Sequence, residues 1–276
     1  MTADKTSEIR VYAPSIVTRD AIEFSKEITA ARLGLGRAGA SLPTRAVLEF
    51  TLDHARARDA VHMPLDFAVL SEDCAGLGLE IVKVDSAASD RQIYLRRPDL
   101  GRVLSQSSRA MLEAHKPETA PDVVIVVGDG LSSKAVQTGA VELLRHLVAR
   151  LREMGFSLGP LVLASQARVA LADDIGELLQ ARMSIMLIGE RPGLSSADSL
   201  GAYLTLAPRR QCTDADRNCI SNIRPGGLSY ETAAFKLGWL TENAFWLGAS
   251  GVALKDESDA AIALGSASTK ALSQPE

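Results

Sequence analysis

Three short, almost wholly apolar segments constrain the fold of this chain more than any other feature. They are DVVIVV at 122–127, PLVLAS at 160–165 and SIMLIG at 184–189. Runs that stay apolar along their length are typical of strands buried on both faces, as in parallel sheets. Helical patterns at about 134–154 and 169–181 separate the three runs. Strand and helix therefore alternate at short spacing, which predicts a doubly wound α/β fold.

The same alternation continues towards the end of the chain. AYLTLA at 202–207 predicts a fourth strand, and SYETAAFKLGWLTENAF at 229–245 predicts a closing helix. After about residue 252 the sequence is rich in Ala, Ser and Asp, which favours a loose tail or a frayed helix. We therefore predict a Rossmann-like domain with a mostly parallel sheet over 119–276.

The first part of the chain predicts a smaller α+β region that is mainly helical. A capped helix with one apolar face fits 41–61, and a weaker helical pattern covers 19–34. LEIVKV at 79–84 and RQIYL at 91–95 are interpreted as two short strands around a polar turn. Prolines then mark a boundary, so this region is placed at 1–118.

Composition excludes several classes of protein. The net charge is -4, and Lys and Arg form no basic stripe of the kind that binds nucleic acid. No apolar stretch approaches the ~18 residues of a membrane span, and the N-terminus lacks the apolar core of a secretory signal. Three cysteines without CxxC spacing and four histidines without HExxH favour a reduced, cytoplasmic protein without a zinc site.

Three predicted loops are the candidate binding site. They follow the three buried strands at 128–130, 166–169 and 189–193, and the last reads GERPG. The carboxyl ends of parallel strands share one edge, where open α/β sheets bind their ligands. Glycine and proline could instead do no more than turn the chain at each loop. Three such loops on one edge favour a binding site.

Two glycine motifs are weaker signals. GLGRAG at 34–39 matches GxGxxG but follows a helical pattern instead of a buried strand, which favours a helix end and loop. GDGLSS at 128–133 does follow a strand but lacks the P-loop lysine, so a nucleotide site there has little support. No GxSxG elbow is present, and a lone cysteine such as Cys219 is more often a small apolar residue than a nucleophile.

Several stretches together resemble the light chain, or small subunit, of ethanolamine ammonia-lyase. The resemblance spans about 33–241, and the segments LIGERPGL and RNCISNI are far more specific than a glycine pattern. The other matching segments are GRAG, TRAVLEFTLDHARARDAV, RQIYLRRPDLGR, VVIVVGDGLSSKAV and IGELLQARMSIMLIGERPGLSSADSLGAY.

The resemblance implies an adenosylcobalamin-dependent lyase that converts ethanolamine to acetaldehyde and ammonia. It implies a hetero-oligomer in which a large TIM-barrel subunit holds the substrate, and cobalamin lies between that subunit and this chain. The family's cobalamin contacts carry over to Val169, Glu190 and Cys219. Region 1–118 would dock on the large subunit, and this chain would supply no catalytic residue. The cofactor, rather than the protein, carries the difficult chemistry in such enzymes.

Other interpretations of these residues stay open from the sequence. Val169 could be a core residue at a helix start, and Glu190 could pair with Arg191 or with a partner subunit. No histidine begins an HxDxxG motif, so the chain supplies no lower axial ligand to cobalt. Family members from microcompartment-forming bacteria have a longer leader, and GLGRAG here begins at Gly34, which disfavours a microcompartment.

Two functions of other classes compete with this one. The first is a stand-alone Rossmann-like enzyme with a nucleotide at GDGLSS. The second is a scaffold paralogue that keeps the fold but has lost the cofactor. The presence of Val169, Glu190 and Cys219 at the matching positions argues against the scaffold.

Overall fold

The computed structural model describes residues 15–22, 28–29, 31–114 and 116–262. The chain divides into two compact units, Met1–Arg56 and Ala57–Glu276. This division comes earlier in the chain than the boundary expected near residue 118. The assignment of separate roles to 1–118 and 119–276 stays a prediction.

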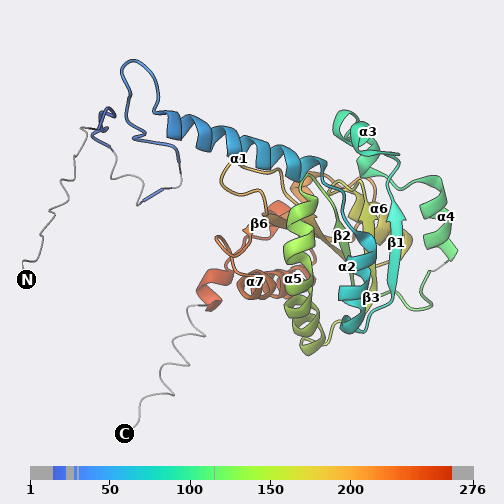
Figure 1. The fold of residues 1–276 in the computed structure, drawn as a ribbon. Coiled ribbons are helices and arrows are strands. Elements are labelled where there is room, and N and C mark those ends of the chain that lie inside the picture. Colours follow the sequence, from blue (N-terminus) through green and yellow to red (C-terminus); the bar gives the residue numbers. More distant parts are fainter. Residues whose placement is uncertain (1–14, 23–27, 30, 115, 263–276) are drawn as a thin grey trace, which may run out of the picture. The chain divides into compact units, whose positions relative to one another are not determined.

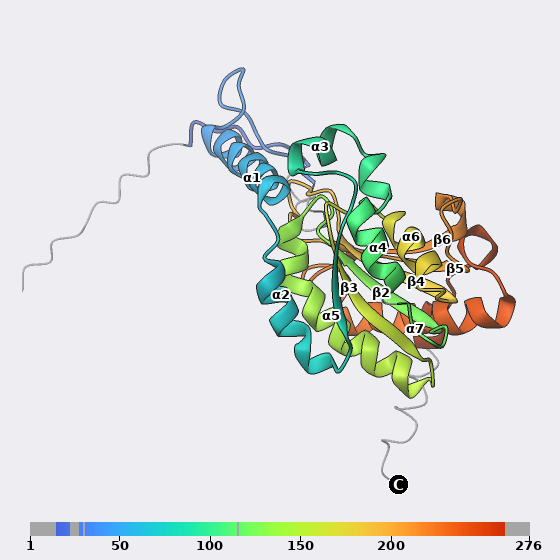
Figure 2. The same cartoon turned by 90° about the vertical axis from the view of Figure 1, so that its right-hand side faces the viewer.

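A six-stranded mixed sheet is the centre of the second unit (Figures 1 and 2). Its order is β1-β3-β2-β4-β5-β6, and the first four strands in this order are parallel. Strand β5 runs antiparallel to β4, and β6 runs antiparallel to β5. The strands are β1 (Ile81–Asp85), β2 (Val123–Gly128), β3 (Leu158–Ser165), β4 (Met183–Gly189), β5 (Leu200–Leu206) and β6 (Arg217–Ile223).

Helices cover both faces of this sheet and create two apolar cores. Val123, Ile125 and Val127 of β2 pack with residues of the first group of helices, and Val124 and Val126 pack with the second group. Because successive side chains of a strand point to opposite faces, a strand between two cores must be apolar throughout. The first group is α2 (Phe67–Cys74), α5 (Ser133–Glu153) and α7 (Tyr230–Leu247), and the second is α4 (Gln106–Ala114) and α6 (Leu171–Leu178).

The predicted fold class is confirmed, with two details that the sequence did not predict. All the strands and helices predicted from 122 to 189 are present, within a few residues at their ends. The predicted fourth strand is β5, and it forms an antiparallel pair with β4 instead of following a crossover helix. Strand β6 was not predicted at all. The sheet is therefore parallel in its first half and antiparallel at the edge formed by β5 and β6.

The prediction of a strand at 91–95 is wrong, because this segment forms helix α3 (Arg91–Arg96). The Asp90 side chain accepts a hydrogen bond from the Ile93 backbone N–H and so caps the first turn. The helix buries Tyr94 completely. The predicted strand at 79–84 is confirmed as β1, and it joins the main sheet by pairing with β3.

The first unit has little core of its own in the part that the structure describes. Of those residues, only Gly34, Gly36 and Pro43 are buried. Gly36 has a left-handed φ of 76°, and a Cβ there would lie 2.6 Å from the Thr18 carbonyl oxygen. Gly36 of the GLGRAG motif therefore allows two backbone segments to approach closely where Thr18 pairs with Arg37 as in a strand. The helical pattern predicted at 19–34 lies partly outside the described residues.

The remaining elements are short, apart from α1 (Thr44–His62). No helix in the described ranges is long and apolar enough to cross a membrane. The tail predicted from about 252 begins within the 3-10 helix η5 (Gly251–Ala253) and has a helical turn at 258–262. The rest of the tail lies outside the described residues. The 3-10 helices are η2 (Ala75–Leu77), η3 (Leu100–Arg102), η4 (Asp214–Asp216) and η5 (Gly251–Ala253).

Candidate functional site

The three predicted loops meet at one edge of the sheet and surround a cavity of about 350 Å³. The loops follow β2, β3 and β4, as the parallel arrangement requires. The prediction that they share an edge is confirmed. The cavity is lined by Tyr94, Gly130, Leu131, Arg168, Val169, Ile188, Gly189, Glu190, Arg191 and Tyr203.

Direct backbone contact between two of these loops explains their glycines. Gly130 has a left-handed φ of 59°, and a Cβ there would lie 2.2 Å from the Gly189 carbonyl oxygen. A Cβ on Gly189 would lie 2.0 Å from the Ser132 carbonyl oxygen. The Leu131 N–H also donates to the Gly189 carbonyl at 2.9 Å. Gly130 of GDG and Gly189 of GERPG therefore allow the loops to pack together, so these two glycines need no phosphate ligand to explain them.

Val169 is half-buried at the point where the second loop enters α6. Its carbonyl oxygen accepts the Ala172 N–H at 3.2 Å, which starts the helix. Its side chain contacts the core on the α6 face and also lines the cavity. Val169 therefore both starts α6 and lines the cavity, two roles that the sequence left as alternatives.

Glu190 follows β4 and also lines the cavity. Its Oε2 accepts a hydrogen bond from Ser199 Oγ at 2.6 Å and from the Asn222 N–H at 3.2 Å. Its hydrogen bonds go to these two residues and not to Arg191. Asn222 has a left-handed φ of 58° at an irregular point of β6, which brings its N–H towards the carboxylate. Glu190 therefore ties the loop after β4 to the far edge strand.

Cys219 lies on β6, directly opposite Tyr203 on β5. Residues opposite one another on neighbouring strands place their side chains on the same face, so the thiol and the phenol are neighbours. Desolvation by neighbouring atoms raises the pKa of both groups, although the Cys219 side chain is on the exposed surface. Both therefore stay protonated at neutral pH. Cys219 is next to the cavity through Tyr203, and it does not line the cavity itself.

Among the described residues, Glu190 is the only carboxylate that lines the cavity. In the ranges that the structure describes, no group of three or more His, Cys, Asp or Glu side chains could hold a metal ion. Ser132, near the edge, donates to the Ala197 carbonyl oxygen at 2.6 Å and caps α5, so it has a structural role. The fold and the site define a Rossmann-like α/β protein with a cavity at the carboxyl edge of its parallel strands.

The particular family is shown by comparison with known proteins. The family model of the ethanolamine ammonia-lyase light chain (EutC) matches residues 19–255. The chain belongs to this family, and it is the small subunit of a carbon–nitrogen lyase.

Relatives match over most of their length. The ethanolamine ammonia-lyase small subunit of Rhodopseudomonas palustris is 56% identical over 233 residues, which cover 84% of this chain and 89% of the relative. Those of Azotobacter vinelandii and Pseudomonas aeruginosa are 54% and 52% identical over 238 and 236 residues. These matches cover 86% and 85% of this chain, and 88% and 86% of the two relatives.

Three residues at or beside the cavity had no role in the sequence-based prediction. Tyr203 could have been found, because in AYLTLA it alternates with residues that face the core. Asp129, the middle residue of GDG, belongs to a predicted loop, and it contacts the loop after β3 without lining the cavity. Tyr94 was placed on a strand that does not exist, and nothing in its local sequence indicates a contact with the loop after β3.

Proposed function

We propose that this chain closes one side of an adenosylcobalamin site and that the large subunit closes the other. The cavity of about 350 Å³ is the observation that supports this most. It is open and far smaller than a corrinoid, so a second chain must cover the rest of such a ligand. The word "subunit" in the names of the relatives agrees with a complex of two kinds of chain.

The chemistry of the residues fits a corrinoid. A corrin ring has apolar faces and a fringe of carboxamides. Val169 and Ile188 offer apolar contact. Glu190 uses Oε2 within the chain, and its Oε1 can accept from a carboxamide N–H. Cys219 and Tyr203 extend the contact surface across β5 and β6, where their side chains are exposed and half-buried.

Adenosylcobalamin supplies the radical that starts such deaminations. This chain would bind and orient the cofactor and exclude water from it. Desolvation raises the pKa of its phenol on β5 and its thiol on β6, so both stay protonated at neutral pH. Within the described residues no histidine lines the cavity.

The N-terminal unit is proposed to dock on the large subunit. Its described part buries only two glycines and a proline, while nine of its large apolar side chains are exposed. Apolar exposure on this scale marks protein interfaces. The three cysteines are free thiols, which agrees with a cytoplasmic complex. The exposed apolar residues are Ile16, Ile22, Ile28, Leu33, Leu42, Val47, Leu48, Phe50 and Leu52.

The test combines this chain with a large subunit and adenosylcobalamin and measures ammonia release from ethanolamine. We expect activity only when both chains are present. Val169→Asp should raise the Kd for the cofactor at least about tenfold, because a charge would face an apolar ligand surface. Val69→Asp is the matched control, since Val69 is 43% exposed on α2, which covers the other face of the sheet.

Two results would refute the proposal. One is equal activity with and without this chain. The other is the same cofactor affinity in Val169→Asp as in the wild type. Saturable binding of NAD by this chain alone would favour the nucleotide enzyme instead.

A further inference from the structure

The loop that carries Val169 has a strained backbone that other residues must hold in place. Gln166, the first residue after β3, has a left-handed φ of 51°. This conformation costs a residue other than glycine about 1–2 kcal/mol. It persists only where surrounding contacts compensate for it. The contacts that do so come from two buried side chains.

Asp129 is the first of these side chains. It follows β2, is 2% exposed, and accepts two backbone hydrogen bonds from the loop. Its Oδ2 accepts the Gln166 N–H at 3.0 Å, and its Oδ1 accepts the Ala167 N–H at 2.9 Å. Both carboxylate oxygens are therefore used as acceptors. An amide in this place could accept only one of the two bonds, because its nitrogen is a donor.

Tyr94 of α3 is the second. Its ring is fully buried, and its hydroxyl donates to the Ala167 carbonyl oxygen at 3.1 Å. Burial raises the pKa of this phenol to about 12, so it remains a donor at neutral pH. The Arg168 guanidinium lies over the ring at 4.2 Å, and its Nη2 donates to the Tyr94 carbonyl oxygen at 3.2 Å. Tyr94 thus holds both Ala167 and the residue that precedes Val169.

Together the two side chains hold the Ala167 residue at both its polar backbone groups. Asp129 accepts from its N–H and Tyr94 donates to its C=O. Val169 is two residues further along the chain. We propose that Asp129 and Tyr94 are positioning residues that fix Val169 and Arg168 at the cavity for cobalamin binding. This inference rests on the proposed function of the same cavity.

A similar contact at the other end of the same two strands supplies a matched control. Asp122 Oδ2 accepts the Ser157 N–H at 2.9 Å and the Ser157 Oγ–H at 2.7 Å. It therefore ties the start of β2 to the start of β3, as Asp129 ties their ends. Neither Asp122 nor Ser157 lines the cavity. A substitution at Asp122 should affect stability and leave cofactor binding unchanged.

The experiment measures the Kd for adenosylcobalamin and kcat at saturating cofactor in the assembled complex of both subunits. Asp129→Asn should raise the Kd about tenfold, because one backbone N–H loses its acceptor. Tyr94→Phe keeps the ring and should raise the Kd about threefold. In both variants kcat at saturating cofactor should stay within about twofold of the wild type. Asp122→Asn should bind cofactor as the wild type does.

The outcomes separate this inference from the proposed function. If the wild-type complex does not bind adenosylcobalamin, the proposed function fails. If Val169→Asp weakens binding while Asp129→Asn and Tyr94→Phe match Asp122→Asn, the positioning role is overturned and the site stands. If Asp129→Asn does not fold, Tyr94→Phe decides alone, and an unchanged Kd in that variant overturns the inference.

Discussion

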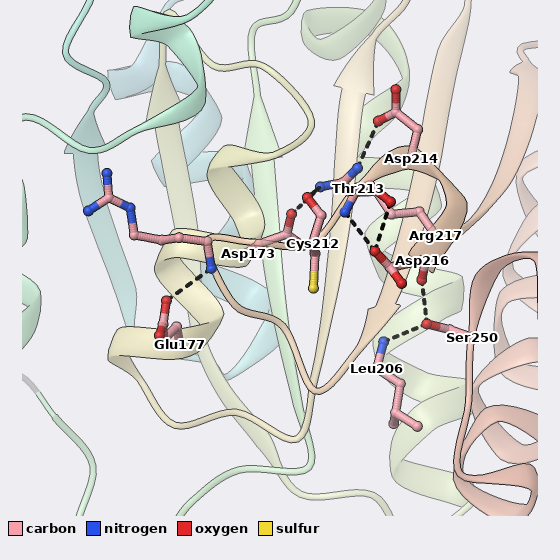
Figure 3. Close-up of polar contacts among 10 residues, drawn as sticks. Asp173, Glu177, Leu206, Cys212, Thr213, Asp214, Asp216, Arg217 and Ser250 are labelled. Atoms are coloured by element: carbon pink, nitrogen blue, oxygen red, sulfur yellow. Dashed lines mark hydrogen bonds and ion pairs between the residues drawn. The ribbon is translucent and has the colours of Figure 1, made fainter.

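A buried ion pair at the start of β6 gives the sharpest stability prediction. The side chains of Arg217 and Asp173 are 3% and 2% exposed, and Nη2 of the arginine donates to Oδ2 of the aspartate (Figure 3). Nη2 also donates to the Cys212 carbonyl oxygen at 3.0 Å, and Nη1 donates to Asp214 Oδ1 at 2.7 Å. The pair therefore joins α6 to β6 and to the segment before it.

Arg217→Met would remove the charge and keep much of the apolar volume. It would leave the Asp173 carboxylate buried without its partner, which costs about 3–5 kcal/mol. Whole domains of this kind are stable by only about 5–15 kcal/mol, so the loss would be a large fraction. The double variant Asp173→Leu with Arg217→Met removes both charges and should recover most of this loss.

Urea unfolding of the full chain, followed by circular dichroism, measures these free energies. Asp214→Asn is the control, because Asp214 is 96% exposed and its pair with Arg217 should contribute at most about 1 kcal/mol. A loss below about 1 kcal/mol in Arg217→Met would refute the reasoning. So would a double variant less stable than Arg217→Met.

Three other changes test separate parts of the structure. Burial opposes ionisation of Asp122, yet hydrogen bonds from Ser157 and Arg182 lower its pKa. The ionised carboxylate therefore stabilises the folded chain above about pH 4, and this stabilisation is lost as the pH falls. Asp122→Asn should make the fall of Tm with acid less steep, and an unchanged dependence of Tm on pH would contradict this. Gly130→Ala places a Cβ 2.2 Å from a carbonyl oxygen in a left-handed backbone and should lower stability by at least about 1–3 kcal/mol in urea unfolding. Leu144→Ala, in the core, should lower the free energy of unfolding by about 2–5 kcal/mol, while Trp246→Ala, at a residue that is 84% exposed, should change it by at most about 0.5 kcal/mol. Equal losses in the two variants would contradict the assigned core.

The parallel half of the sheet could be predicted because its strands are buried on both faces. Such strands must be apolar at every position, and DVVIVV and SIMLIG meet this condition. The helices between them also show their apolar stripes plainly. Once the strands were identified, the edge that carries the loops followed from geometry alone, and Val169 and Glu190 lie there.

The antiparallel half could not be predicted in the same way, although one signal existed. A parallel crossover needs about a dozen or more residues, usually with a helix. The connection at 190–199 is shorter than that and contains no helical pattern. This length indicates that β5 must turn back beside β4. RNCISNI has no regular alternation, because the irregular point near Asn222 directs both Ile220 and Ile223 into the core.

The site residues differ in how they could be found. Cys219 was predicted from the resemblance alone, since its strand was not recognised. Tyr94 reaches Ala167 across 73 positions of the sequence, and only the folded chain brings them together. Contacts of this kind depend on how α3 packs, which local patterns do not encode. Short segments such as 91–95 fit a helix or a strand equally well without their tertiary neighbours.

Substitutions at neighbouring positions of β5 should have different effects, because successive side chains of a strand point to opposite faces of the sheet. Ala202 and Leu204 face one core, while Tyr203 between them packs against the edge of the other core and lines the cavity. Polar replacements at the first two positions would lower the amount of folded chain in the cell. Under the proposed function, a replacement at Tyr203 would lower that amount less and would also lower the yield of ammonia per molecule. A survey of variants that records abundance and activity together would therefore show the two effects at successive codons.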